Sequence, residues 1–177
     1  MKIILAITGA SGLQYGIRLH EALKGLGHAV WLVNSEGAEI VAKAEGVKLP
    51  KPDFGERDIA APVASGSHKI DGMIIAPCSL KTLGEVANGV GSNLVSRSAE
   101  VMLKERKKLV LVVRETPLSY IAIKNMEAVT LAGGVILPAC PGFYSKPKSV
   151  QDLVDFVCGK VLDQLGIDHK LYRRWKE

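Results

Sequence analysis

A run of small residues near the N-terminus, Thr8-Gly9-Ala10-Ser11-Gly12, has the composition of a phosphate-binding turn. It follows the apolar run Ile3–Ile7, and Gly16 lies shortly after it. Small residues let the backbone approach a phosphate, and the N-terminus of a following helix supplies free N–H groups and a positive dipole end. A tight turn without a ligand has the same composition, and the spacing is not the GxGxxG of dinucleotide-binding folds. Alone, the run is a weak signal.

Polar side chains also follow the other apolar runs of the chain. Asn34-Ser35 has the residue types of a helix N-cap. Pro77-Cys78-Ser79-Leu80-Lys81-Thr82 supplies two further hydroxyl groups that could open a helix. Arg114-Glu115-Thr116-Pro117 brings an arginine, which can form a bidentate clamp on phosphate. The run Pro138-Ala139-Cys140-Pro141-Gly142-Phe143-Tyr144 ends on a tyrosine in a rigid turn.

The apolar runs themselves predict buried strands, because they are rich in Ile, Val and Leu without alternation. We expect strands at Ile3–Ile7, Ala29–Val33, Gly72–Ala76, Leu109–Val113 and Val135–Leu137. Apolar residues at helical spacing predict helices over 15–26, 94–106, 120–131 and 150–165, and Ser149 with Asp152 resembles a capping box for the last of these. Residues 47–69 carry three prolines and little periodicity, which predicts an irregular segment.

Strands alternating with helices indicate the α/β class, with a doubly wound, mostly parallel sheet flanked by helices in a Rossmann-like arrangement. Ligands of such sheets bind outside the carboxyl ends of the strands, where every polar run described above would lie. The convergence of Gly, Ser, Thr, Arg and Tyr at one sheet edge is not required by hydrophobic burial. It is a stronger signal than any single motif.

Length and composition bound the remaining possibilities. A chain of 177 residues, 47% of them hydrophobic, fits one domain spanning 1–177. The net charge of +5 suits anionic small molecules, and the basic run at 104–108 lacks the interleaved aromatics of a nucleic-acid site. No apolar run approaches the length of a membrane span.

Three scattered cysteines without CxxC spacing favour a reducing, cytoplasmic location, and the scattered histidines argue against a metal site. Cys78 has no histidine nearby in sequence, so we expect a packed thiol and not a nucleophile.

Taken in order along nearly the whole chain, these motifs resemble the flavin prenyltransferases, the UbiX family long described as aromatic-acid decarboxylases. The resemblance is carried by Thr8 to Gly16, Ala76-Pro77-Cys78-Ser79, Asn93-Leu94 with Arg97, Leu103 to Arg106, Arg114 to Pro117, Pro141 to Tyr144, and Arg174-Trp175. It implies an FMN-binding flavoprotein domain that joins the dimethylallyl group of dimethylallyl phosphate to N5 and C6 of reduced FMN without a metal. The prenylated FMN would then serve a UbiD-type decarboxylase, and the protein would form a homo-oligomer, as a dodecamer.

The resemblance also implies roles for individual residues. The implied FMN contacts are Gly9, Ala10, Ser11, Ser35, Ser79, Leu80, Lys81, Thr82 and Arg114. The implied dimethylallyl phosphate contacts are Tyr144 and Lys160, with Arg97 and Lys104 supplied by a neighbouring subunit. Ser11, Glu45 and Glu115 match residues assigned to the chemistry, and Trp175 matches an aromatic that closes over the prenyl group. Some relatives have arginine in place of Lys160, so a bidentate phosphate contact is lost there.

Two other functions share these features. A cysteine-decarboxylase-like flavoprotein would bind FMN on the same architecture, but normally uses a histidine and an Asn-Met substrate clamp. Here Asn125-Met126 falls within an expected helix, and no histidine follows a strand. A non-catalytic flavin carrier would not need Glu45, Glu115 or the tail tryptophan.

Overall fold

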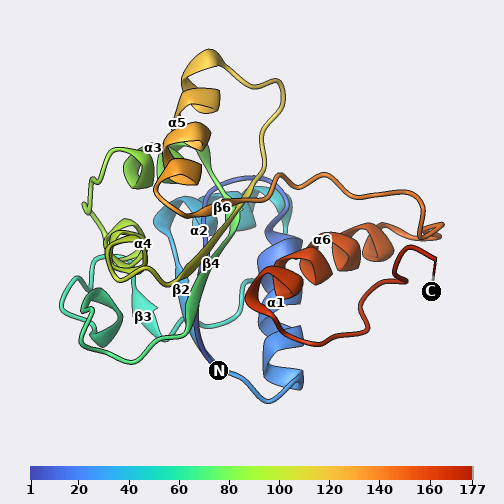
Figure 1. Ribbon diagram of the computed structural model, residues 1–177, viewed down its shortest axis with the longest axis horizontal. Coiled ribbons are helices and arrows are strands. Elements are labelled where there is room, and N and C mark those ends of the chain that lie inside the picture. Colours follow the sequence, from blue (N-terminus) through green and yellow to red (C-terminus); the bar gives the residue numbers. More distant parts are fainter. Residues whose placement is uncertain (177) are drawn as a thin grey trace.

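A computed structural model describes residues 1–176 of the chain, and in them a single twisted sheet runs through the centre (Figure 1). The strands are β1 (Lys2–Ile7), β2 (Ala29–Asn34), β3 (Phe54–Gly55), β4 (Gly72–Cys78), β5 (Lys108–Val113) and β6 (Val135–Ile136). Their order is β3-β2-β1-β4-β5-β6, and each neighbouring pair is parallel. This order reverses between β1 and β4, which is where doubly wound folds bind their ligands.

The central strands are buried on both faces, which explains why their sequences do not alternate. In β1, Ile3, Leu5 and Ile7 belong to one apolar cluster, whereas Ile4 and Ala6 belong to another on the opposite face. Successive side chains of a strand point to opposite faces, so each face receives every second residue. Both faces must therefore be covered by helices.

Helices cover each face of the sheet. On one face lie α1 (Leu13–Gly25) and α6 (Val150–Leu165). The helix α2 (Glu36–Glu45) contributes Ala38 and Ala42 to the apolar cluster on this face. On the other lie α3 (Leu80–Ala87), α4 (Leu94–Lys104) and α5 (Tyr120–Leu131). Figure 1 shows α1 beside α6 to the right of the sheet, with α3, α4 and α5 to its left. The doubly wound α/β fold expected from the sequence is confirmed.

The structure differs from the sequence-based expectation mainly at element ends. Residues 47–69, expected to be irregular throughout, contain the edge strand β3 and a 3-10 turn, η1 (Pro62–Ala64). The helix expected to reach Arg106 ends at Lys104, because Arg106 adopts a left-handed conformation with φ 54°. The capping box at Ser149 and Asp152 is confirmed, since each side chain accepts a hydrogen bond from the backbone N–H of the other residue. Among the described residues, we find no helix with the length and apolarity needed to traverse a bilayer.

Candidate active site

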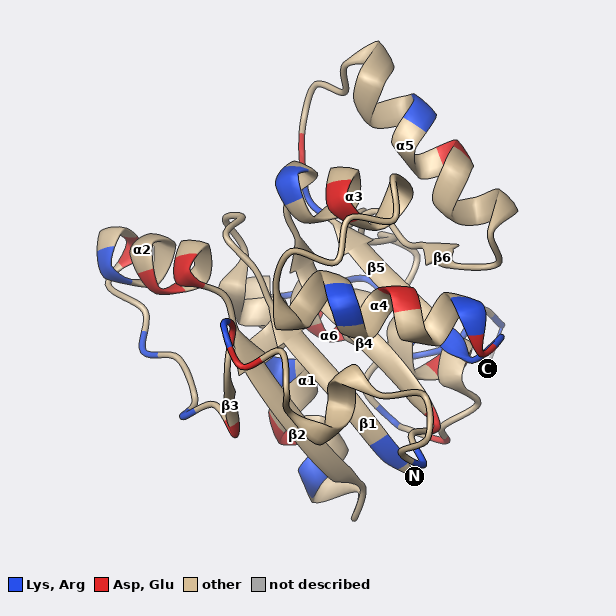
Figure 2. Ribbon diagram, turned by 90° about the vertical axis from the view of Figure 1, so that its left-hand side faces the viewer, with Lys and Arg blue, Asp and Glu red and all other residues tan. Residues whose placement is uncertain are grey.

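A cavity of about 600 Å³ lies where the polar runs after β1, β2, β4 and β5 meet. This volume falls within the range of small-molecule and cofactor sites. The cavity is lined by Gly9, Ala10, Ser35, Glu36, Gly37, Ile40, Glu56, Arg57, Ser79, Leu80, Lys81, Thr82, Ser92, Asn93, Arg114 and Glu115. Figure 2 shows α2 and α3, whose first residues contribute to this lining, at the end of the sheet opposite the N-terminus of the chain. The sheet edge predicted from the sequence is therefore the edge that carries the cavity.

Three helices present their N-termini to the cavity. Ser35 caps α2 by accepting a hydrogen bond from the backbone N–H of Ala38 at 3.0 Å. Ser79 caps α3 by accepting one from Thr82 at 3.3 Å, and the hydroxyl oxygens of these two residues are 3.1 Å apart. Asn93 caps α4. Amides of the first turn and the positive ends of the helix dipoles stabilise an anion, so this arrangement suits phosphate.

Two glycines bring the turn after β1 against the start of α2. A Cβ atom on Gly9 would lie 2.8 Å from the carbonyl carbon of Gly37, which is closer than real Cβ contacts come. Thr8 fixes the other side of the turn: its hydroxyl donates to the Pro77 carbonyl at 2.8 Å and accepts from the Ser79 N–H at 2.9 Å. The small residues of the turn thus serve close backbone approach between β1, α2 and α3.

Arg114 stands at the carboxyl end of β5 and lines the cavity. Its side chain is half-buried, and its Nε is buried without a hydrogen-bond partner. A buried guanidinium nitrogen left unpaired is costly unless an anion accepts from it, so this atom fits a phosphate ligand. Tyr15 lies nearby: burial raises the pKa of its phenol, as do Cys158 and Cys140, whereas the charge of Arg114 acts in the opposite direction.

The rim of the cavity carries charges of both signs. Glu56 accepts a hydrogen bond from the backbone N–H of Glu36 at 2.5 Å, so a carboxylate already lies at the N-terminus of α2. Glu36 in turn accepts from the Nε of Arg57 at 2.6 Å. The Nζ of Lys81 lies 3.3 Å from the Oε1 of Glu85. Glu115 is exposed and accepts from the N–H of Thr116 at 2.9 Å.

The structure brings most of the predicted FMN contacts together. Gly9, Ala10, Ser35, Ser79, Leu80, Lys81, Thr82 and Arg114 all line the cavity, as does Glu115. Ser11 lies beside this lining in the exposed turn before α1, and Glu45 is exposed at the far end of α2.

The residues predicted to bind dimethylallyl phosphate lie outside the cavity lining. Arg97 is in α4 beside Glu100, and Lys104 ends that helix. A separate group forms around α6, where the rings of Tyr144 and Trp175 meet edge-to-face with their centroids 5.3 Å apart. Lys160 projects from α6, its Nζ 3.6 Å from the carboxylate of Asp163.

Sequence reasoning proposed no role for several lining residues. Gly37 directly follows the recognised cap at Ser35, so the helix start could have pointed to it. Asn93 could have been recognised as the N-cap of a helix, because Ser96 follows it at the spacing of a capping box. Glu56 and Arg57 fall in the irregular segment, where no periodicity marks them.

Within residues 1–176, no group of three or more His, Cys, Asp or Glu side chains gathers as metal ligands would. No histidine lines the cavity. Cys78 is fully buried at the end of β4, and burial raises the pKa of its thiol far above the ordinary value. It is a packed thiol, as expected.

Comparison with known proteins supports one family throughout. The model of the family described as Flavoprotein matches residues 1–162. The flavin prenyltransferase UbiX of Methanothermobacter thermautotrophicus is 48% identical over 98% of this chain and 94% of its own length. A crystal structure of AnUbiX (PadA1) in complex with FMN and dimethylallyl pyrophosphate has a TM-score of 0.95 and 44% identity, covering 99% of this chain and 97% of that one.

A dodecameric FMN-dependent UbiX-like decarboxylase from Escherichia coli O157:H7 has a TM-score of 0.94 and 41% identity over 100% of both chains. Its similarity, like that of the other two relatives, extends over at least 98% of this chain. The chain therefore belongs to the Flavoprotein family and, within it, to the UbiX flavin prenyltransferases.

Proposed function

We propose that this protein transfers the dimethylallyl group of dimethylallyl phosphate to N5 and C6 of reduced FMN, without a metal ion. The observation that carries this proposal is the cavity, which is lined by residues from the capped N-termini of α2, α3 and α4 and by Arg114, whose buried Nε has no partner. Donors from several strand ends thus converge on a volume suited to a phosphorylated cofactor. The FMN complex of the relative AnUbiX supports the same choice of ligand.

Within the cavity, we assign several lining residues contacts with FMN that fit their positions. Ser35 at the start of α2 binds a phosphate, as do Ser79 and Thr82 at the start of α3, whereas the Glu36 amide of α2 is already bound by Glu56. Leu80 and the backbone of Gly9 and Ala10 line the cavity beside them. Arg114 clamps the phosphate with its guanidinium. Reduced flavin supplies the electron-rich ring that receives the prenyl group.

The donor molecule brings a second phosphate, for which we propose the group around α6. Tyr144 and Lys160 would bind it, and Trp175 would close over the prenyl chain. The relative complexed with dimethylallyl pyrophosphate supports a prenyl donor of this class. As the allylic C–O bond breaks, these donors stabilise the negative charge that collects on phosphate. The indole face and the flavin stabilise the positive charge on carbon.

Closing the new ring at C6 releases a proton, and we assign its removal to Glu115, with Ser11 between it and the flavin. Glu115 is exposed at the cavity wall, so it can exchange that proton with solvent. Glu45 remains a third candidate for this chemistry, although it lies at the far end of α2.

We further propose that the active form is a homo-oligomer, a dodecamer, in which a neighbouring subunit contributes Arg97 and Lys104. The dodecameric relative supports this. So does α5, where Tyr120, Ile121, Ile123 and Leu131 are exposed. Figure 2 shows this helix with few charged residues along its length. Apolar side chains gathered on one helix are typical of an interface.

The product would pass to a UbiD-type decarboxylase. We propose the reducing cytoplasm as the compartment of this protein. The three free cysteines are compatible with that compartment.

The reaction is tested by anaerobic incubation with reduced FMN and dimethylallyl phosphate, followed by mass spectrometry of the extracted flavin. We expect the flavin to gain one isoprene unit, in equal yield with and without a chelator. Unchanged FMN would indicate a flavin carrier. Release of carbon dioxide from a cysteinyl substrate, with FMN unchanged, would indicate the cysteine-decarboxylase alternative. Carbon-13 labelling of the prenyl group would then show whether it bonds to both N5 and C6.

A further inference from the structure

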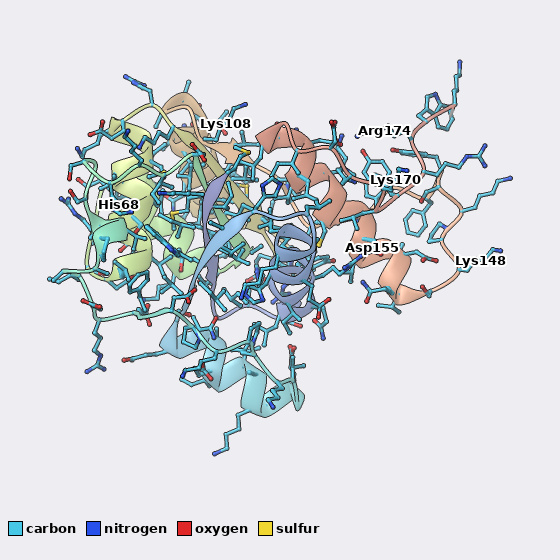
Figure 3. All side chains as sticks on the ribbon, turned by 90° about the horizontal axis from the view of Figure 1, so that it is seen from below. His68, Lys108, Lys148, Asp155, Lys170 and Arg174 are labelled. Atoms are coloured by element: carbon cyan, nitrogen blue, oxygen red, sulfur yellow. The ribbon has the colours of Figure 1, made fainter. Side chains whose placement is uncertain are left out.

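The described part of the C-terminal segment, residues 167–176, folds back along α6, where three of its residues hydrogen-bond to one carboxylate. Asp163 accepts hydrogen bonds from the Tyr172 hydroxyl at 2.7 Å, from Arg174 Nη2 at 2.8 Å and from His169 Nε2 at 3.2 Å. The Nδ1 of His169 accepts from the Leu171 N–H at 3.2 Å, so the ring proton is on Nε2 and points to Asp163. Figure 3 shows Arg174 and Lys170 on the segment that runs beside α6.

The segment fits closely against α6 because one helical residue has no side chain. A Cβ atom on Gly159 would lie 2.4 Å from the ring of Tyr172 and 2.6 Å from the ring of His169. Glycine in the middle of a helix is less favourable than alanine, so its presence here needs a packing reason. The reason is the space it leaves for the two rings that Asp163 binds.

Ring contacts continue from this docking site to the residues proposed to bind the prenyl donor. Tyr172 lies against Phe156, with centroids 4.9 Å apart, and Phe156 meets Tyr144 at 5.5 Å. Tyr144 in turn meets Trp175 at 5.3 Å. Trp175 is still 65% exposed, so its place depends on the segment that carries it and not on burial of its own ring.

We propose that Asp163 is a positioning residue for the prenyl donor: together with the gap at Gly159, it holds the C-terminal segment on α6 so that Trp175 lies against Tyr144. The consequence for catalysis rests on the proposed function, whereas the docking itself does not. The Asp163 carboxylate also lies 3.6 Å from the Nζ of Lys160, so only an effect that Gly159→Ala shares is assigned to the segment. Asp163 would act through that segment. Its loss should therefore weaken use of the prenyl donor and leave FMN binding unchanged, because FMN contacts come from the strand ends and not from α6.

Two variants loosen the segment in different ways. Asp163→Asn removes the negative charge that His169, Tyr172 and Arg174 share. Gly159→Ala places a methyl group where the two rings lie but leaves Asp163, and its contact with Lys160, in place. Because alanine favours helix, this variant keeps α6 folded and separates loss of docking from loss of fold.

Asp155→Asn is the matched control. Asp155 lies on the same helix, and its side chain is 17% exposed against 18% for Asp163. It forms an ion pair with Arg18 at 2.6 Å, compared with 2.8 Å between Asp163 and Arg174. Its hydrogen bonds and ion pair are with Arg18 and Gln151, outside residues 167–176. Any effect common to both aspartates would therefore reflect general stability of α6.

The experiment measures two quantities on the full chain: the rate of tryptic cleavage after Lys170, and the steady-state constants for dimethylallyl phosphate. For Asp163→Asn and Gly159→Ala, we expect faster cleavage. We also expect KM for dimethylallyl phosphate to rise about tenfold at unchanged FMN affinity. In Asp163→Asn the cause is the lost charge on the hydrogen bonds, and in Gly159→Ala it is the displaced rings of Tyr172 and His169. Asp155→Asn should match the wild type in both.

Unchanged cleavage and KM in the two test variants would overturn the proposal, as would an equal change in the control. If the wild-type protein left FMN unprenylated, the proposed function would fail. The cleavage rates would still decide whether Asp163 and Gly159 hold the segment.

Discussion

Replacing Arg114 with methionine removes the cation at the cavity wall while keeping a side chain of similar reach. In the structure the Nε of Arg114 is buried without a partner, so the substitution breaks no internal hydrogen bond at that atom. It should therefore leave the free energy of unfolding unchanged or raise it, because an unsatisfied buried polar group costs about 1–3 kcal/mol. The affinity for FMN should fall instead.

The size of that fall follows from the kind of bond lost. A hydrogen bond to a charged group contributes about 1.5–3 kcal/mol, so its loss should raise the Kd for FMN by roughly 10- to 150-fold. Arg114→Lys should lie between the wild type and methionine, because an ammonium keeps the charge but not the bidentate fork. Quenching of flavin fluorescence measures the affinity, and thermal denaturation of the flavin-free protein measures stability.

Arg57→Met is the control for a general charge effect. Arg57 also lines the cavity, but its side chain is 86% exposed and forms a surface ion pair with Glu36. Exposed pairs of this kind contribute little, so we expect less than a roughly fivefold change in FMN affinity. Arg114 would not be a phosphate ligand if Arg114→Met bound FMN as tightly as the wild type, or if both variants lost affinity equally.

Three further predictions concern the turn, the proton and the C-terminal segment. Gly9→Ala places a Cβ 2.8 Å from the Gly37 carbonyl carbon, so titration should show weaker FMN binding; unaltered affinity would mean that the close approach is not needed. Glu115→Gln should bind FMN normally yet form no prenylated flavin by mass spectrometry, and undiminished turnover would exclude Glu115 as the base. At Asp163, burial raises the carboxyl pKa, but hydrogen bonds from Arg174, Tyr172 and His169 outweigh it and bring the pKa from 3.8 down to about 2. A lowered pKa stabilises the docked segment above pH 3.8, and that contribution is lost as the pH falls toward 2. Trp175 fluorescence in a Trp31→Phe background should change in that interval; no change there, or the same change in Asp163→Asn, would contradict this.

The parts of the fold that follow from local patterns could be predicted from the sequence. Continuous apolar runs located β1, β2, β4 and β5, because strands buried on both faces contain few polar residues. The starts of α2 and α3 could be read from Ser35 and Ser79, whose side chains bind the first turn in place of the missing backbone partner. The cavity followed from topology, since parallel strands end at one edge.

What could not be predicted depends on contacts between distant residues. Phe54–Gly55 pairs with the end of β2, but two residues carry no periodicity, and only tertiary pairing makes them a strand. The same holds for Glu56, which reaches the cavity from the irregular segment. Docking of His169 and Tyr172 on Gly159 gives no local signal either, because the helix and the segment that returns along it meet only after folding.

In the proposed function, loops from separate strands build an FMN site beside a prenyl-donor site, and no divalent ion takes part. A crystal structure of the protein with FMN and dimethylallyl phosphate, grown in the presence of a chelator, tests this arrangement. We predict density for FMN in the cavity, with its phosphate bound by Arg114 and the first turns of α2 and α3, and the second phosphate beside Tyr144 and Lys160. Flavin bound elsewhere on the molecule, or flavin that binds only when a divalent cation is restored, would contradict the account.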